Sequence, residues 1–85
     1  KKFKCRQLAF DAIKKGGNMS CIVNAANEIV NAGFRKGECG FLQMADIIEE
    51  TMAKASFDSN PDLDVYLQTD AEARRIAAEL MKVNG

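Results

Sequence analysis

Four polar side chains share one face of a predicted helix. Asn24, Asn27, Glu28 and Asn31 recur at spacings of three and four residues, which places them on the same side of an α-helix. Such a face could bind a ligand or a metal ion, or it could cap the helix and tie it to neighbouring backbone. Amides both donate and accept hydrogen bonds, but they are poor nucleophiles and cannot act as general bases.

We therefore interpret this amide face as structural. Asn24 is the expected N-cap, and Asn27 and Glu28 are expected to bond to the backbone of an adjacent segment. If so, Asn27→Ala should destabilise the protein by about 1–3 kcal/mol, the usual penalty for orphaning a buried polar partner.

The cysteines are the other residues that could do chemistry. Cys5, Cys21 and Cys39 are an odd number and form no CxxC pair, which argues against a disulfide framework. The sequence has no His, so zinc would need all three thiolates plus a carboxylate, and no Ser–His or Cys–His nucleophile can form. We expect reduced, partly buried thiols in a cytoplasmic protein.

The stretch from residue 58 onwards superficially resembles a calcium loop, with Asp58, Asn60 and Asp62 at alternate positions. Leu63 stands where a glycine is required, and Thr69 stands where a bidentate glutamate is expected. An Asx-rich turn is the better interpretation.

Asn18 opens a formal glycosylation sequon, which we attribute to chance because no secretory signal is visible. We therefore predict no catalytic, cofactor-binding or metal-binding residue.

Apolar residues recur with a helical period throughout, and no stretch alternates long enough to predict a strand. Helices are expected over residues 4–15, from Asn24 to a stop at Gly37, and over residues 44–55. Gly33 suggests that a neighbouring helix crosses closely there. After Pro61 a short helical turn is expected at residues 63–68. Thr69 as N-cap with Glu72 three residues later forms a capping box for the last helix.

Length and charge set the class of protein. Eighty-five residues make one small domain, residues 1–85, and the formal net charge of zero offers no field to attract nucleic acid or an acidic membrane. No apolar run is long enough to span a membrane. The expected fold is all-α, with four to five helices in a small bundle or left-handed superhelix. The chain opens on Lys1-Lys2 rather than Met, which suggests a fragment of something larger.

Three stretches together resemble a known family. They are CRQLAFDAIKKGG, then VNAANEIVNAGFRKGECGFLQMADIIE, then DVYLQTDAEARRIA. In this order they are similar to the C-terminal domain of 1-deoxy-D-xylulose 5-phosphate reductoisomerases, and the specific part is the motif at residues 24–28. Val23 replaces the family's usual Leu, and Gly33 stands where Ala is common.

The resemblance implies a parent enzyme that converts 1-deoxy-D-xylulose 5-phosphate to 2-C-methyl-D-erythritol 4-phosphate in non-mevalonate isoprenoid biosynthesis. It implies NADPH and a divalent cation, Mg or Mn, for the parent and none for this fragment, which alone should be inactive. The implied partners are the upstream catalytic domain, a sugar phosphate and a second copy in a homodimer. The alternative is a free-standing helical protein-interaction module. An open reading frame that continues upstream of Lys1 would favour the first reading.

Overall fold

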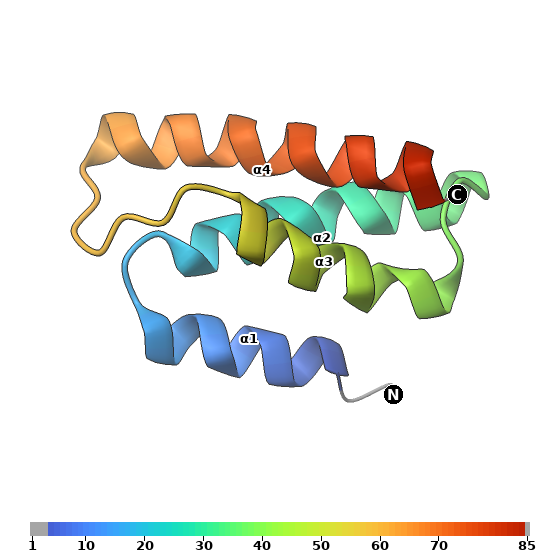
Figure 1. The fold of residues 1–85 in the computed structure, drawn as a ribbon, viewed down its shortest axis with the longest axis horizontal. Coiled ribbons are helices and arrows are strands. Elements are labelled where there is room, and N and C mark those ends of the chain that lie inside the picture. Colours follow the sequence, from blue (N-terminus) through green and yellow to red (C-terminus); the bar gives the residue numbers. More distant parts are fainter. Residues whose placement is uncertain (1–3, 85) are drawn as a thin grey trace.

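Four α-helices form most of the chain that the structure describes. A computed structural model describes residues 4–84, with the backbone alone for Asn84. The helices are α1 (Lys4–Lys15), α2 (Met19–Lys36), α3 (Phe41–Lys54) and α4 (Leu63–Asn84). α2 and α3 pack together as a central pair, α1 packs on one side of the pair, and α4 packs on the other (Figure 1). Residues 4–84 contain no strand, which confirms the all-α prediction.

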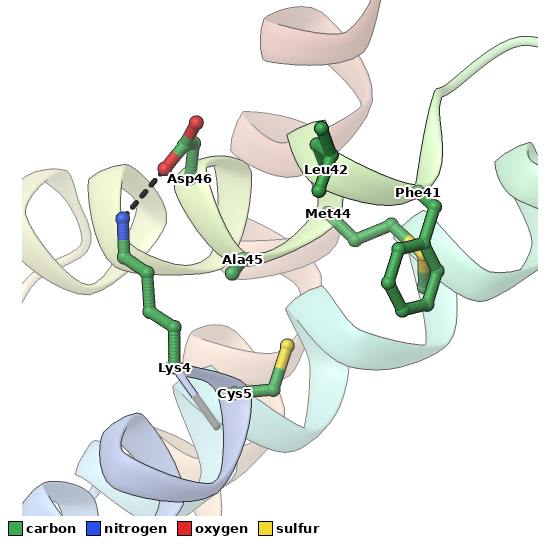
Figure 2. Close-up of a pocket in the computed structure, with 7 residues that line it drawn as sticks. All are labelled: Lys4, Cys5, Phe41, Leu42, Met44, Ala45 and Asp46. Atoms are coloured by element: carbon green, nitrogen blue, oxygen red, sulfur yellow. Dashed lines mark hydrogen bonds and ion pairs between the residues drawn. The ribbon is translucent and has the colours of Figure 1, made fainter. Parts of the chain in front are cut away.

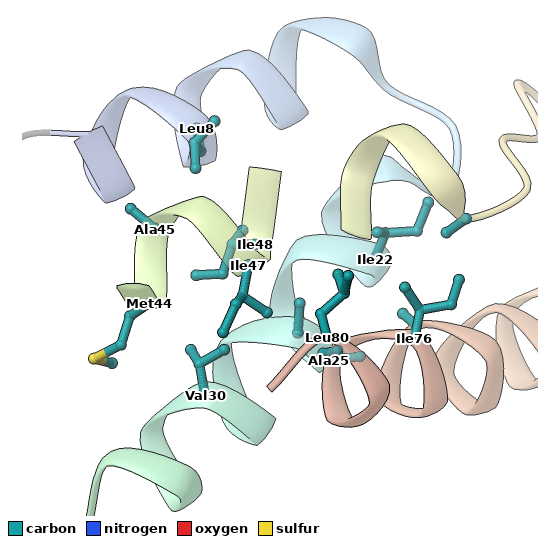
Figure 3. Packing of buried hydrophobic residues seen from close by; sticks show 14 of the residues in the cluster. Leu8, Ile22, Ala25, Val30, Met44, Ala45, Ile47, Ile48, Ile76 and Leu80 are labelled. Carbon is teal, nitrogen blue, oxygen red and sulfur yellow. The ribbon is translucent and has the colours of Figure 1, made fainter. Parts of the chain in front are cut away.

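One apolar core joins the four helices (Figure 3). Its largest fully buried apolar side chains are Ile22 and Val30 of α2 and Ile48 of α3. α1 contributes only Leu8 and Ala12 from its predicted apolar stripe, because it covers the central pair from one side alone. Burial of such side chains is the main stabilising contribution to a domain of this size. No helix within residues 4–84 is long and apolar enough to cross a membrane.

The turn between α1 and α2 depends on two glycines. Gly16 and Gly17 have φ angles of +75° and +56°, a left-handed conformation that other residues adopt at a cost. The Gly16 N–H donates to the Ala12 carbonyl at 3.0 Å and closes α1. A left-handed glycine thus ends the first helix.

α2 begins five residues before the predicted N-cap. It starts at Met19 after Asn18, so the prediction that Asn24 caps this helix was wrong. Residues 19–23 contribute two buried side chains, Met19 and Ile22, and tertiary burial of this extra turn outweighs the capping preference of Asn24. The predicted stop at Gly37 is confirmed, since Gly37 has φ +77° and its N–H bonds back to carbonyls of the last turn.

The other two helix starts also lie earlier than expected. α3 starts at Phe41 rather than near residue 44, and the Gln43 side-chain carbonyl accepts the Gly40 N–H at 2.8 Å. α4 starts at Leu63, and Asp62 Oδ1 accepts the Val65 N–H at 2.9 Å, as an N-cap does. The separate turn at residues 63–68 and the capping box of Thr69 and Glu72 were therefore wrong. Both segments belong to one continuous helix.

The crossing of α2 and α4 is close at Gly33. A Cβ built on Gly33 would meet the Met81 sulfur of α4 inside van der Waals contact. Gly33 is itself buried. The predicted close approach of a neighbouring helix at this glycine is confirmed.

Candidate functional site

The amide face of α2 lies mostly in solvent. Asn24, Asn27 and Glu28 are exposed, and Asn31 is half-buried. The Asn31 amide donates to the Asn27 carbonyl at 2.7 Å and to Asn27 Oδ1 at 3.0 Å. The predicted bond from Asn27 to the backbone of an adjacent segment was wrong, because the side chain pairs within its own helix, one turn further on. Asn24 instead lines a shallow hollow between α1 and α2 together with Ile13 and Cys21.

Glu28 pairs with a side chain rather than with backbone, so that part of the prediction was also wrong. Arg74 of α4 donates through Nη2 to Glu28 and through Nε to Asp70 at 2.9 Å. The hydrogen bond to Asp70, followed by that to Glu28, raises the pKa of Arg74. All three side chains are more than a third exposed, and exposed pairs typically contribute about 0.2–1 kcal/mol. Asp70 and Arg74 thus form a surface pair one turn apart on α4.

The buried polar cluster lies at Asn18, at the start of α2. Asn18 has 0% exposure. Its Nδ2 donates to the Ser56 carbonyl at 2.9 Å and to Thr69 Oγ1 at 2.8 Å, and its Oδ1 accepts the Asp58 N–H at 2.8 Å. One amide thus joins α2, the segment between α3 and α4, and α4. A buried polar group is tolerated when it is satisfied in this way.

Thr69 and Glu72 take part in the same cluster rather than in a cap. Thr69 is buried within α4, where its hydroxyl faces Asn18. The Glu72 carboxylate accepts from the Ser56 N–H at 2.9 Å and from the Ser56 hydroxyl at 3.3 Å. Glu72 therefore holds the chain that follows α3 against α4, and Thr69 joins α4 to Asn18 at the start of α2.

The backbone reinforces this connection. The Asn18 N–H donates to the Asp58 carbonyl at 3.0 Å, so the two residues exchange hydrogen bonds. Asp58 Oδ1 accepts the Asn60 N–H at 2.8 Å, which confirms the predicted Asx turn. The sequence did hold a signal for Asn18, since an asparagine directly after two glycines is typical of a turn that enters a helix. The interpretation of this stretch as a chance sequon leaves that signal unused.

The described thiols sit in different environments. Cys5 is exposed, Cys21 is half-buried and Cys39 is buried, and all three are free. Burial raises the pKa of the Cys39 thiol. Burial, followed by the nearby charge of Asp70, raises that of Cys21. Across residues 4–84, no three His, Cys, Asp or Glu side chains are grouped so that they could hold a metal ion.

A hollow of about 240 Å³ lies between the first turns of α1 and α3 (Figure 2). We call it the α1–α3 hollow. Its floor is mainly apolar, and a Lys–Asp ion pair spans one side (Figure 2). The lining residues are Lys4, Cys5, Phe41, Leu42, Met44, Ala45 and Asp46.

The fold and these clusters define a class of protein, a small helical domain whose buried polar groups serve to join its own helices. The chain belongs to the family of DXP reductoisomerase C-terminal domains, whose family model matches residues 1–76.

Individual relatives agree with this assignment. The chain is 56% identical over 81 residues to the 1-deoxy-D-xylulose 5-phosphate reductoisomerase of Bacteroides thetaiotaomicron and 41% identical over 80 residues to that of Listeria monocytogenes. These matches cover 95% and 94% of this chain but 21% of each relative. A solved structure of the Zymomonas mobilis reductoisomerase in complex with NADPH matches 88% of this chain and 20% of its own, with a TM-score of 0.80 and 41% identity. The chain thus spans about a fifth of the length of its relatives.

Proposed function

We propose that this chain is the C-terminal helical domain of a 1-deoxy-D-xylulose 5-phosphate reductoisomerase. The observation that carries the proposal is the family match over residues 1–76, which covers only a fifth of each full-length relative. The parent enzyme would form 2-C-methyl-D-erythritol 4-phosphate with NADPH, in non-mevalonate isoprenoid biosynthesis, in the cytoplasm and as a homodimer.

NADPH, a divalent cation (Mg or Mn) and the sugar phosphate are assigned in this proposal to the upstream part of the parent. Two observations support the assignment. The Zymomonas mobilis structure is an NADPH complex in which this chain matches only 20% of the protein. The acidic side chains that meet here are occupied by cations of the chain itself, Glu28 and Asp70 by Arg74 and Asp46 and Glu49 by Lys4, so they do not fit a metal ion.

The role of residues 1–85, taken as one domain, is to pack on the upstream catalytic domain and to support its geometry. The polar contacts of Asn18, Thr69 and Glu72 favour a structural role, because they join α2, α4 and the segment that follows α3. Asn24, Asn27 and Glu28, on the exposed face of α2, are assigned a minor structural role, in which Glu28 adds an ion pair to Arg74 of α4.

Removing residues 1–85 from the full-length enzyme tests this role. We expect a lower melting temperature and a loss of turnover, measured by calorimetry and by NADPH oxidation. A truncated enzyme with normal turnover and an unchanged melting temperature would contradict the proposal.

A milder variant covers the case in which the truncated enzyme does not fold. Asn18→Ala in the full-length enzyme loosens only this domain. The temperature at which activity is lost should fall together with the melting temperature of the domain. Activity that persists after this domain has melted would also refute the supporting role.

The competing function is a free-standing module that binds a partner helix or peptide. The exposed apolar side chains Phe41 and Leu42 favour that candidate. The gene separates the two possibilities, since only the first requires a long coding sequence upstream of Lys1.

A further inference from the structure

The α1–α3 hollow continues into an exposed apolar surface. Phe41 and Leu42 are 60% and 64% exposed on its edge. The ring of Phe34, also exposed, lies edge-on to that of Phe41 with centroids 6.1 Å apart. Neighbouring exposed apolar side chains around a hollow are typical of a surface that another element covers.

One lysine pairs with two carboxylates beside the hollow. Lys4 Nζ lies 2.6 Å from Asp46 and 3.0 Å from Glu49. These hydrogen bonds raise the pKa of Lys4. Within residues 4–84, the only cation that lines the hollow is already paired, and the floor is mainly apolar, so an apolar segment fits the hollow best.

The position of the hollow indicates its occupant. It is lined by Lys4 and Cys5, the first two residues of α1. α1 therefore begins beside the hollow, at the end of the molecule where α3 also begins (Figure 1). About four-fifths of the length of the relatives lies outside this chain. A segment attached at that point has a high effective concentration at the hollow.

We propose that the α1–α3 hollow is the docking surface for an apolar segment of the upstream part of the same polypeptide. This inference rests on the proposed function, because it requires an upstream part. It adds to that function the face of the domain on which the upstream part packs.

The thiol of Cys5 is exposed and lines the hollow, so its reactivity measures whether an upstream segment covers this surface. We would label the native full-length protein with iodoacetamide and follow Cys5 by mass spectrometry after digestion. A Leu63→Cys substitution at the start of α4, where the native side chain is 73% exposed, supplies a remote reporter, and the rate for each site is divided by its rate in the urea-unfolded protein. Docking predicts that Cys5 is protected about tenfold or more relative to the reporter, as expected of a surface exposed only by local opening.

Two matched variants identify the contact. Leu42 and Leu67 are 64% and 62% exposed, and both lie in helices. Leu42→Lys places a charge in the docked interface and should raise the labelling of Cys5 to nearly that of the reporter. Leu67→Lys should leave the labelling of Cys5 unchanged.

Three results would overturn the proposal. They are a Cys5 that labels as fast as the reporter in the native protein, protection that survives Leu42→Lys, and protection that grows with protein concentration, which would assign the cover to a second copy. If truncation of residues 1–85 abolishes turnover while native Cys5 labels freely, the proposed function stands and only this docking surface is refuted.

Discussion

Asn18 stabilises the protein through the groups that it satisfies. Its side chain is fully buried and bonds to Ser56, Asp58 and Thr69. The bond to Thr69 is buried and the bonds to Ser56 and Asp58 are part-buried, so loss of the amide leaves these groups without their protein partner. Asn27 has the same chemistry, but it lies in solvent and bonds only to Asn31 one turn away. The burial of an asparagine, and not its chemistry alone, therefore determines how much its amide contributes to stability.

We therefore expect Asn18→Ala to lower the free energy of unfolding by about 2–4 kcal/mol, because an orphaned buried donor or acceptor costs about 1–3 kcal/mol. Asn27→Ala is the matched control and should change it by less than about 0.5 kcal/mol, as is usual for an exposed position. Urea unfolding followed by circular dichroism measures both. Equal losses of stability in the two variants would contradict the conclusion that burial sets the cost of losing an amide.

At the scale of the helices, periodicity predicted the packing faces well. Ala73, Ile76, Ala77 and Leu80 of α4 are buried as their spacing indicates. The helix starts were harder, because three of them lie several residues before the predicted positions. Capping preferences are worth about 1 kcal/mol, so burial of one more turn can override them. That burial depends on partners distant in sequence, which a local pattern does not contain.

The α1–α2 turn offers a test at this scale, since its two glycines differ in their surroundings. A Cβ on Gly16 would meet nothing within 4 Å, whereas a Cβ on Gly17 would run into the Asp58 carbonyl. Gly16→Ala should cost about 1–2 kcal/mol, the penalty for a left-handed L-residue. Gly17→Ala should cost about 1–2 kcal/mol more, because the Asp58 carbonyl must move and its bond from the Asn18 N–H is lost.

Thermal or urea unfolding of the two variants checks this difference. The comparison isolates the contact with Asp58, since both glycines have positive φ angles. If Gly16→Ala proved as damaging as Gly17→Ala, the segment around Asp58 would not depend on close approach to the turn.

At the scale of the whole molecule, α2 is the organising element. It contacts α1, α3 and α4, and its apolar residues reach the centre of the core (Figure 3). The all-α class followed from the sequence because apolar residues recur at helical spacing along most of the chain. The α1–α3 hollow did not, because Cys5 and Leu42 are far apart in sequence and meet only once the helices have packed.

The same packing connects stability to pH through two thiols. Burial raises the pKa of Cys21 and Cys39 above the ordinary value of 9.0. In the unfolded chain these thiols lose their protons at lower pH than in the folded protein. Between the two pKa values the folded state therefore holds more protons, and the free energy of unfolding falls as pH rises. The contribution of the thiols is fully present below the unfolded pKa and is lost as pH rises through the folded pKa.

Urea unfolding at intervals from pH 7.5 to about pH 10 should show this decline, which begins near the ordinary thiol pKa. Lys4 and Arg74, whose pKa values are also raised, lose stabilising charge in the same direction but at higher pH.

Cys39→Ala separates the contribution of this thiol from that of the two cations. It should lower stability at pH 7.5, because a buried side chain is truncated, yet flatten the decline above pH 8.5. Cys5→Ala removes an exposed thiol and controls for the loss of a cysteine. A decline as steep in Cys39→Ala as in the wild type would show that this buried thiol does not link stability to pH.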